Sequence, residues 1–348
     1  MTVKKESSTQ NYPHKPDEKA FYDTIIVGAG VVGWATAMYG GRLGLKTLVI
    51  GDIFGGTIIL THLVENYPGF IRLTGPELGE KLEEHARDYD IDILSDRVSS
   101  VQKAKKGKDD AFLVHTQDGK KFHTRTVIFC TGTKFKKLGV PGEKEFENKG
   151  VHYCALCDGP IYKGKERLGV VGGSDSAAKE ALLLTEYAKK VYIIYRGDKI
   201  RPEPINGKRV DAKIKEGKIE IIYRTNITEI RGDKLMTSVV LDAPYKGSKE
   251  FKLDALFIDV GHIPLSDLAI PLGVKLNEKK EIVINRKSET NVPGVFAAGD
   301  VVDTEFKQAI TGVGEGVAAV YQAYKYVKEG EHISATSNSG NSVKEKRK

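Results

Sequence analysis

The feature that most constrains the fold is a β-rich run that enters a glycine-rich turn and is followed by a helical pattern. Residues 21–27 are rich in β-branched and aromatic side chains, the turn reads Gly28-x-Gly30-x-x-Gly33, and residues 34–43 have helical character. Glycines at this spacing allow a tight turn, close approach of the backbone to a pyrophosphate, and close packing of helix on strand. The N-terminus of such a helix also favours phosphate charge. The stretch therefore predicts a nucleotide-binding unit.

The same pattern recurs later in the chain. A second β-rich run, 167–171, enters a turn from Gly172 to Ala177, and residues 178–188 read as a helix. Ser174 stands where the middle glycine is expected, which leaves a backbone less room to approach a phosphate. We predict cofactor contacts from Gly172, Ser174 and Ala177. Two such units predict an α/β protein with two Rossmann-like nucleotide-binding domains, and two pyrophosphates.

Polar residues follow the second strand of each unit. Asp52 comes after the run 46–50, near the distance at which an acid accepts hydrogen bonds from ribose hydroxyls; it could equally be a turn residue. Arg196 follows the run 190–195, and Arg201 lies shortly after it. Arginines in this place suit a nucleotide 2′-phosphate, although arginines on surface loops are also common.

Chemistry is expected at the run Cys154-Ala155-Leu156-Cys157-Asp158. A Cys-x-x-Cys loop is too short to stabilise a fold much by loop closure, but it suits a dithiol that cycles with a disulfide. The alternative is half of a zinc site, but four ligands are needed, and His152 would add only a third. We therefore predict a redox pair and no metal. A flavin with a nicotinamide can take a hydride and pass electrons to sulfur.

Cysteine usage and the chain ends bear on the compartment. Cys130 sits in the apolar run 127–130, where we expect a small core residue, because an apolar setting raises a thiol pKa. Three cysteines make no disulfide framework, which indicates a reducing compartment. The first twenty residues are polar and no long apolar run occurs, so we predict a cytoplasmic protein without membrane contact. The net charge of +7 is mild and no basic stripe is interleaved with aromatics, so no nucleic-acid binding is predicted.

Taken in order, these stretches resemble the low-molecular-weight thioredoxin reductase family from about Tyr22 to Lys328. The family holds FAD in a domain made of the N- and C-terminal segments, with the NAD(P)-binding domain inserted between them. The most specific matches are Cys154 to Asp158, the Gly28 to Gly33 turn, residues 64–69, and residues 294–300 followed by Gln308-Ala309. We expect the FAD domain to comprise residues 21–138 and 261–330, and the NAD(P)-binding domain, which contains the cysteine pair, to comprise residues 139–260. Residues 1–20 would form a flexible arm, and residues 331–348 a flexible basic tail.

The resemblance also implies roles for individual residues. Cys157 would be the sulfur that faces the flavin, Cys154 the sulfur that attacks the partner, and Asp158 the acid-base residue. Besides the first glycine turn, the residues expected on the FAD side are Gly51, Asp52, Gly55, Gly56, Thr57, Asn66, Gly132, Gly299, Asp300, Lys307, Gln308 and Ala309.

Three positions depart from the family pattern. Thr57 stands where glutamine is usual, and Lys307 where arginine is usual. The NADPH signature His-Arg-Arg-x-x-x-Arg reads Tyr195-Arg196-Gly197-Asp198-Lys199-Ile200-Arg201, so one arginine is lost. A charged hydrogen bond contributes roughly 1.5–3 kcal/mol, so we expect the preference for NADPH over NADH to fall by about one to two decades.

We therefore predict a homodimeric, flavin-dependent thioredoxin-disulfide reductase. It would pass electrons from NADPH, or NADH, through FAD and the Cys154/Cys157 dithiol to a thioredoxin-like protein. One alternative keeps the flavin and dithiol but takes electrons from another donor, such as a ferredoxin. Another is a redox- or metal-sensing protein in which the cysteines report state without turnover.

Overall fold

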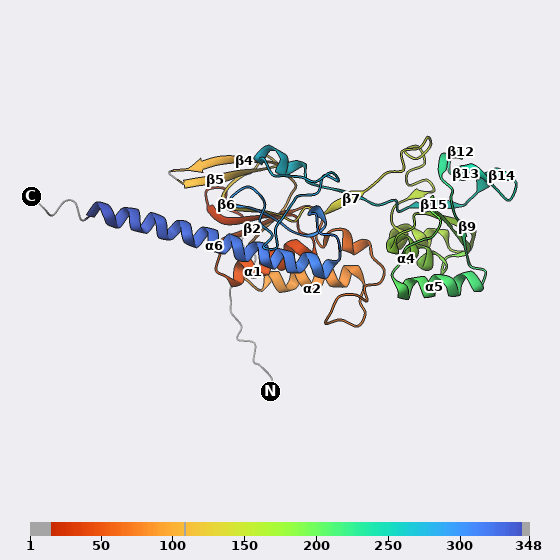
Figure 1. Cartoon of the computed structure of the whole chain (residues 1–348), viewed down its shortest axis with the longest axis horizontal. Coiled ribbons are helices and arrows are strands. Elements are labelled where there is room, and N and C mark those ends of the chain that lie inside the picture. The colour runs from red at the N-terminus through yellow and green to blue at the C-terminus, as the bar shows by residue number, and fades with distance from the viewer. Residues whose placement is uncertain (1–14, 108, 343–348) are drawn as a thin grey trace, which may run out of the picture. The chain divides into compact units, whose positions relative to one another are not determined.

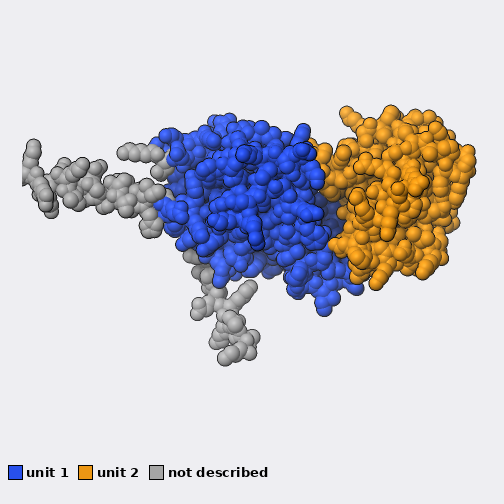
Figure 2. All heavy atoms as spheres, in the orientation of Figure 1, with its two compact units in different colours: residues 1–133, 264–348 blue, residues 134–263 orange. Residues whose placement is uncertain are grey.

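The computed structural model describes residues 15–107 and 109–342, and of residues 330–342 only the backbone. The chain forms two compact units (Figure 2). Unit 1 comprises residues 1–133 and 264–348, and unit 2 comprises residues 134–263. Unit 2 is thus an insertion in the sequence of unit 1. It begins five residues before, and ends three residues after, the inserted domain that the sequence predicts.

Unit 1 is built on a seven-stranded sheet. Its strands are β1 Phe21–Val27, β2 Thr47–Gly51, β3 Asp92–Ser95, β4 Val98–Lys106, β5 Asp109–Thr116, β6 Lys121–Phe129 and β17 Val295–Ala297. The order is β3-β2-β1-β6-β5-β4, and β17 pairs with the end of β6. Strands β3, β2, β1, β6 and β17 are parallel, whereas β4 and β5 extend the sheet antiparallel. The carboxyl ends of the parallel strands therefore meet at one edge, where α/β sheets bind ligands.

Three helices pack on one face of this sheet (Figure 1). They are α1 Val31–Arg42, α2 Gly75–Arg87 and α6 Ala309–Ser342, and the short 3-10 turns are η1 Gly56–Leu60, η3 Asp267–Leu272 and η4 Gly299–Val301. Trp34 of α1 is fully buried in the core between helices and sheet. A capping box of Thr74 and Glu77 starts α2. The sequence predicts that the last helix ends near Lys328, but α6 continues because no proline interrupts it.

The ends of the chain are described in part. Residues 1–14 of the predicted arm and 343–348 of the predicted tail lie outside the described residues. Residues 15–20 lead into β1 through a turn in which Ala20 is buried, and Glu18 accepts a hydrogen bond from the N–H of Lys121 at 3.1 Å. The last residues of the predicted arm are thus in contact with unit 1.

Unit 2 is built on a five-stranded parallel sheet. Its order is β11-β10-β9-β15-β8, from strands β8 Val151–His152, β9 Lys165–Val171, β10 Ala188–Ile194, β11 Ile219–Ile222 and β15 Ala255–Ile258. The helices are α3 Ala155–Asp158, α4 Asp175–Leu184 and α5 Pro204–Lys215, with the 3-10 turn η2 Gly159–Tyr162. A separate antiparallel sheet contains β12 Ile227–Gly232, β13 Met236–Tyr245 and β14 Ser248–Lys252.

Each face of the unit 2 sheet is covered by different elements (Figure 1). One core packs α3, α4 and α5 against the strands, and the other packs the β12-β13-β14 sheet against them. The sequence reading misses α5, whose start carries Pro204 and whose middle carries Gly207. The connections between the units, β7 Thr133–Phe135 and β16 His262–Pro264, pair with each other.

Both units thus show the strand, glycine turn and helix that the sequence predicts, and the α/β class is confirmed. No helix within residues 15–107 and 109–342 is long and apolar enough to cross a membrane.

Candidate active site

The first glycine turn follows β1 and opens α1. Gly28 has φ 116°, and a Cβ there would lie 2.2 Å from the carbonyl oxygen of Cys130; a Cβ at Gly33 would lie 1.9 Å from the oxygen of Gly28. Gly30 forms a bridge with Gly55, and a Cβ at Gly56 would lie 2.9 Å from the Cα of Gly30. Bare backbone therefore surrounds the start of α1, whose first turn has no acidic residue and no side-chain cap. Its free N–H groups fit a pyrophosphate.

The second strand of unit 1 delivers Gly51 and Asp52 to the same edge. A Cβ at Gly51 would lie 2.5 Å from the nitrogen of Ala29, so only glycine fits there. The carboxylate of Asp52 accepts two hydrogen bonds from Arg97, at 2.9 and 2.6 Å, and both side chains are partly exposed. Arg97 orients the carboxylate, and one oxygen of Asp52 stays available for ribose hydroxyls. Thr57 is exposed in η1.

The carboxyl ends of β6 and β17 bring the remaining predicted residues of unit 1 to this edge. Gly132 follows β6 with φ 62°, and Gly299 and Asp300 form η4 directly after β17. The amide of Asn66 donates to Gln308 Oε1 at 3.0 Å, which joins a loop to the residue before α6. Ala309 is the first residue of α6.

Lys307 is held in this turn by three contacts. Its Nζ lies 3.1 Å from Glu281 Oε1 and 3.1 Å from the carbonyl oxygen of Asp300, and it also donates to the oxygen of Val302. The side chain of Glu281 is only 9% exposed. Lys307 thus ties the η4 turn to the segment before β17, a role that does not require an arginine.

The second glycine turn joins β9 to α4. Gly172 has φ 156°, and a Cβ there would lie 2.2 Å from the oxygen of Asp259. Ser174 caps α4, since its Oγ accepts from the N–H of Ala177 at 3.2 Å. The turn is as tight as the first, but the serine hydroxyl already satisfies one N–H that a phosphate would use.

The positions after β10 differ from a typical dinucleotide unit. The ring of Tyr195 would lie 2.4 Å from a Cβ at Gly173 and 2.6 Å from a Cβ at Gly197. The predicted phosphate-binding residues Arg196 and Arg201 are both exposed. They lie at the carboxyl edge of the unit 2 sheet, and the N–H of Arg201 donates to the oxygen of Gly173 at 2.7 Å.

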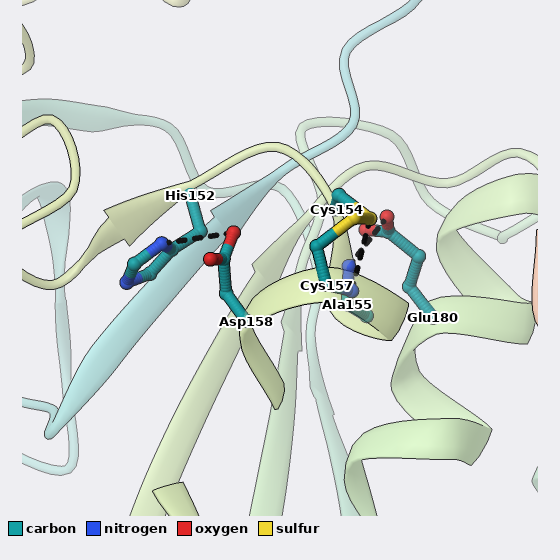
Figure 3. Close-up of a disulfide and its surroundings, with 6 residues drawn as sticks. All are labelled: His152, Cys154, Ala155, Cys157, Asp158 and Glu180. Carbon is teal, nitrogen blue, oxygen red and sulfur yellow. Dashed lines mark hydrogen bonds and ion pairs between the residues drawn. A yellow bond between two sulfur atoms is a disulfide. The ribbon is translucent and has the colours of Figure 1, made fainter. Parts of the chain in front are cut away.

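Cys154 and Cys157 are joined by a disulfide that lies at the start of α3 (Figure 3). Cys154 is the N-cap residue and is buried, whereas Cys157 is exposed. The N–H of Cys157 donates to Cys154 Sγ at 3.0 Å. A hydrogen bond of this kind favours the thiolate of Cys154 once the disulfide is opened.

Asp158 follows the disulfide, and its carboxylate points toward His152 (Figure 3). Oδ2 of Asp158 lies 3.1 Å from Nδ1 of His152, whose Nε2 lies 2.7 Å from the hydroxyl of Tyr162. Burial lowers the pKa of His152, and Asp158 opposes that shift. His152, a candidate metal ligand by sequence, thus contacts Asp158 through one ring nitrogen and Tyr162 through the other.

Two buried acids that the sequence reading misses, Glu180 and Asp259, interact with each other, and Glu180 contacts the start of α3. Glu180 Oε1 accepts from the N–H of Ala155 at 3.4 Å, and Figure 3 shows its carboxylate at the start of α3. Burial and the charge of Asp259 raise the pKa of Glu180 to about 8, and burial also raises the pKa of Asp259. A signal for Glu180 exists in the sequence, because it shares a helix face with the buried residues Ala177 and Leu184.

The third cysteine lies in the core of unit 1. Cys130 is buried and free, and burial raises its pKa to about 12. The prediction that it is a core residue is confirmed.

Comparisons with known proteins place this arrangement in a family. The family model described as pyridine nucleotide-disulphide oxidoreductase matches residues 22–316. A thioredoxin reductase of Bacillus subtilis is 39% identical over 90% of this chain and 96% of its own length. The chain belongs to the low-molecular-weight thioredoxin reductases of this family. As a member, it is a flavoprotein oxidoreductase that uses FAD and NAD(P)H.

Solved structures agree with this membership of the thioredoxin reductases. The thioredoxin reductase of Lactococcus lactis, in its FR conformation, superposes with a TM-score of 0.82 at 37% identity, over 88% of this chain and 99% of that one. The thioredoxin reductase of T. acidophilum gives a TM-score of 0.80 at 37% identity, over 88% and 98% of the two chains. The alternative with a ferredoxin as electron donor gains no support from these relatives.

Proposed function

We propose that this chain transfers two electrons from NAD(P)H to the disulfide of a thioredoxin-like protein, with Cys154 and Cys157 as the exchanging sulfurs. The observation that carries the proposal is the Cys154–Cys157 disulfide at the start of α3, in the same unit as the second glycine turn. A sensor without turnover would have no use for two glycine turns with the geometry of nucleotide sites.

The exchange follows from the chemistry of a dithiol. The Cys154 thiolate attacks one sulfur of the partner disulfide, a mixed disulfide forms, and the other partner sulfur leaves as a thiolate. Cys157 then attacks Cys154 Sγ, so that the Cys154–Cys157 disulfide re-forms and the second partner thiolate leaves. Two protons complete the partner dithiol. The enzyme dithiol is oxidised by two electrons and the partner is reduced by two.

The structure bears on the order of attack. Cys154 is 7% exposed and Cys157 is the accessible cysteine, so attack by Cys154 requires that opening of the disulfide makes its sulfur accessible. The hydrogen bond from the N–H of Cys157 supports Cys154 as the thiolate. Asp158 follows Cys157 directly in the sequence, and its Oδ2 lies 3.1 Å from Nδ1 of His152. We assign Asp158 the acid-base role on this arrangement together with the family resemblance.

The cofactors would be held by the residues of each glycine turn. On the FAD side these are the turn from Gly28 to Gly33, the pair Gly55-Gly56, Asp52 and the start of α6; on the nicotinamide side they are the turn from Gly172 to Ala177 with Arg196 and Arg201. FAD, when bound, supplies the two-electron transfer between a nicotinamide and a disulfide.

The relatives bear on the partner, and the cysteine content bears on the compartment. We assign a thioredoxin-like protein as partner because relatives 39% identical are named thioredoxin reductases. We assign a cytoplasmic location, in line with the low cysteine content. We also assign a homodimer. Light scattering of the purified protein tests the dimer.

An anaerobic titration tests the function. FAD-loaded protein is titrated with NADPH and NADH in turn, and the flavin absorbance should bleach before a disulfide partner restores it. Cys157→Ser should prevent electrons from leaving the flavin. In Cys154→Ser the flavin absorbance should bleach, but the partner should not be reduced. Cys130→Ala is the matched control and should turn over normally. Full turnover in either Ser variant, or protein that cannot take up FAD, would contradict the proposal.

The same variants decide which sulfur attacks. Cys157→Ser should form a trapped mixed disulfide with an activated partner through Cys154, visible by mass spectrometry. If only Cys154→Ser is trapped, the roles of the two cysteines are reversed.

A further inference from the structure

Three arginines surround the carboxyl edge of the unit 2 sheet. Arg196 follows β10, and Arg201 is fixed at the second glycine turn by its N–H bond to Gly173. The third, Arg224, follows β11 and donates its N–H to the oxygen of Gly197 at 3.1 Å. All three side chains are exposed. Since β11 neighbours β10 in the parallel sheet, a residue after β11 reaches the edge where a nucleotide would lie.

Packing explains why position 197 carries no arginine. The ring of Tyr195 lies between Gly173 and Gly197, close enough that a Cβ on either glycine would overlap it. With Tyr195 in this place, position 197 accepts only glycine. The side chain that would follow Arg196 is therefore sterically excluded, and a second guanidinium beside it has to come from another segment.

Arg224 is held in a position that its own type does not favour. It has φ 51°, in the left-handed region that is unfavourable for a residue other than glycine. Its guanidinium forms an ion pair with Asp198, and these side chains are 79% and 72% exposed. An ion pair this exposed adds little stability, so the pair does not offset the backbone cost. Residues in such conformations cluster where ligands bind.

We propose that Arg224 is a specificity residue for the nicotinamide nucleotide, whose guanidinium binds the adenosine 2′-phosphate together with Arg196 and Arg201. The carboxylate of Asp198 pairs with this guanidinium, and its negative charge weakens phosphate binding. The inference rests on the proposed function, because it requires a nucleotide at the second glycine turn. Arginine suits the role because its planar donors match phosphate oxygens and it stays charged.

The test uses two probes that differ only in the 2′-phosphate. Calorimetry on the FAD-loaded protein measures the Kd of adenosine 2′,5′-bisphosphate and of AMP. Arg224→Asn removes the guanidinium but keeps a residue that tolerates the left-handed backbone. We expect its Kd for the bisphosphate to rise about tenfold, at the low end for a charged hydrogen bond because the site is exposed. The Kd for AMP should stay within about twofold.

Further variants separate the role of the charge from that of the fold. Arg224→Lys should fall between Arg224→Asn and the unchanged protein, and Asp198→Asn should bind the bisphosphate more tightly. Arg231→Ala is the matched control, because it removes another exposed, ion-paired arginine of the same unit and should change neither Kd. The same order should appear in kcat/KM for NADPH relative to NADH.

The outcomes distinguish this inference from the proposed function. An unchanged Kd for the bisphosphate in Arg224→Asn, or an equal change for AMP, overturns the inference while the reductase activity stands. If the unchanged protein binds neither probe and neither nucleotide bleaches its flavin, the proposed function fails and the inference fails with it.

Discussion

Replacing Glu180 with glutamine should remove a pH-dependent cost from the fold of unit 2. The carboxyl group is buried beneath the disulfide, with one oxygen on the N–H of Ala155 and the other without a hydrogen-bond partner among the described residues. Burial first, and then the charge of Asp259, raise its pKa from the ordinary 4.5 to about 8. Glutamine keeps the size of the side chain and a carbonyl acceptor for Ala155, but it cannot ionise.

The sign follows from proton linkage. Below pH 4.5 both the native and the unfolded chain hold the proton of Glu180, so it adds no pH dependence. Between pH 4.5 and about 8 the unfolded chain loses the proton while the native state keeps it, so stability falls as the pH rises. Above about pH 8 the full cost to the free energy of unfolding is present. At 1.36 kcal/mol per pKa unit, the difference between the two pKa values lowers the free energy of unfolding by at most about 5 kcal/mol.

Urea unfolding of the purified protein and the Glu180→Gln variant, at pH 5 and pH 9, measures this cost. We expect the two midpoints to be close at pH 5 and the variant to be clearly more resistant at pH 9. Glu220→Gln is a control of opposite sign. Burial alone would raise the pKa of Glu220, but hydrogen bonds from Lys190, Lys246 and Tyr245 outweigh it and lower that pKa to about 2, so this variant should lose stability at both pH values. If Glu180→Gln is less stable than the unchanged protein by the same amount at pH 5 and pH 9, Glu180 is ionised and paired in the native state, and the reasoning is refuted.

Three further predictions concern unit 1. Because burial raises the pKa of Cys130 to about 12, its thiol should resist alkylation at pH 8 in the native protein and react after denaturation; rapid native labelling, followed by mass spectrometry, would contradict its place in the core. Gly28→Ala should abolish FAD retention, because residue 28 has φ 116° and a Cβ there would lie 2.2 Å from the carbonyl oxygen of Cys130. A yellow variant with normal flavin absorbance would refute this turn geometry. Lys307→Ala should lower the free energy of unfolding by about 1–3 kcal/mol through the loss of charged hydrogen bonds, whereas Lys307→Arg should restore most of it; equal urea midpoints for all three proteins would show that these contacts contribute nothing.

The sequence by itself determined the features that local patterns encode. Strand β1 follows the run 21–27, because alternating and then continuous burial of β-branched residues is a property of consecutive positions. The glycine turns were predicted because a positive φ and close backbone approach at Gly28 and Gly172 require residues without a Cβ. The cysteine pair was predicted because its spacing alone suits a disulfide, and Cys130 because its neighbours are apolar.

Only the tertiary structure decided what residues from distant segments do together. Glu180 reads as a charged helix residue until packing of α3 and β15 against α4 buries it beside Asp259. In the sequence Arg224 is an ordinary loop arginine, and only the pairing of β11 with β10 places it beside Gly197. The sequence likewise shows only that an arginine is missing at position 197, whereas the structure shows that the ring of Tyr195 occupies the space of a side chain there. The physical reason is that burial, electrostatic coupling and steric exclusion depend on distances in space, and a spacing in sequence fixes those distances only within a single element or turn.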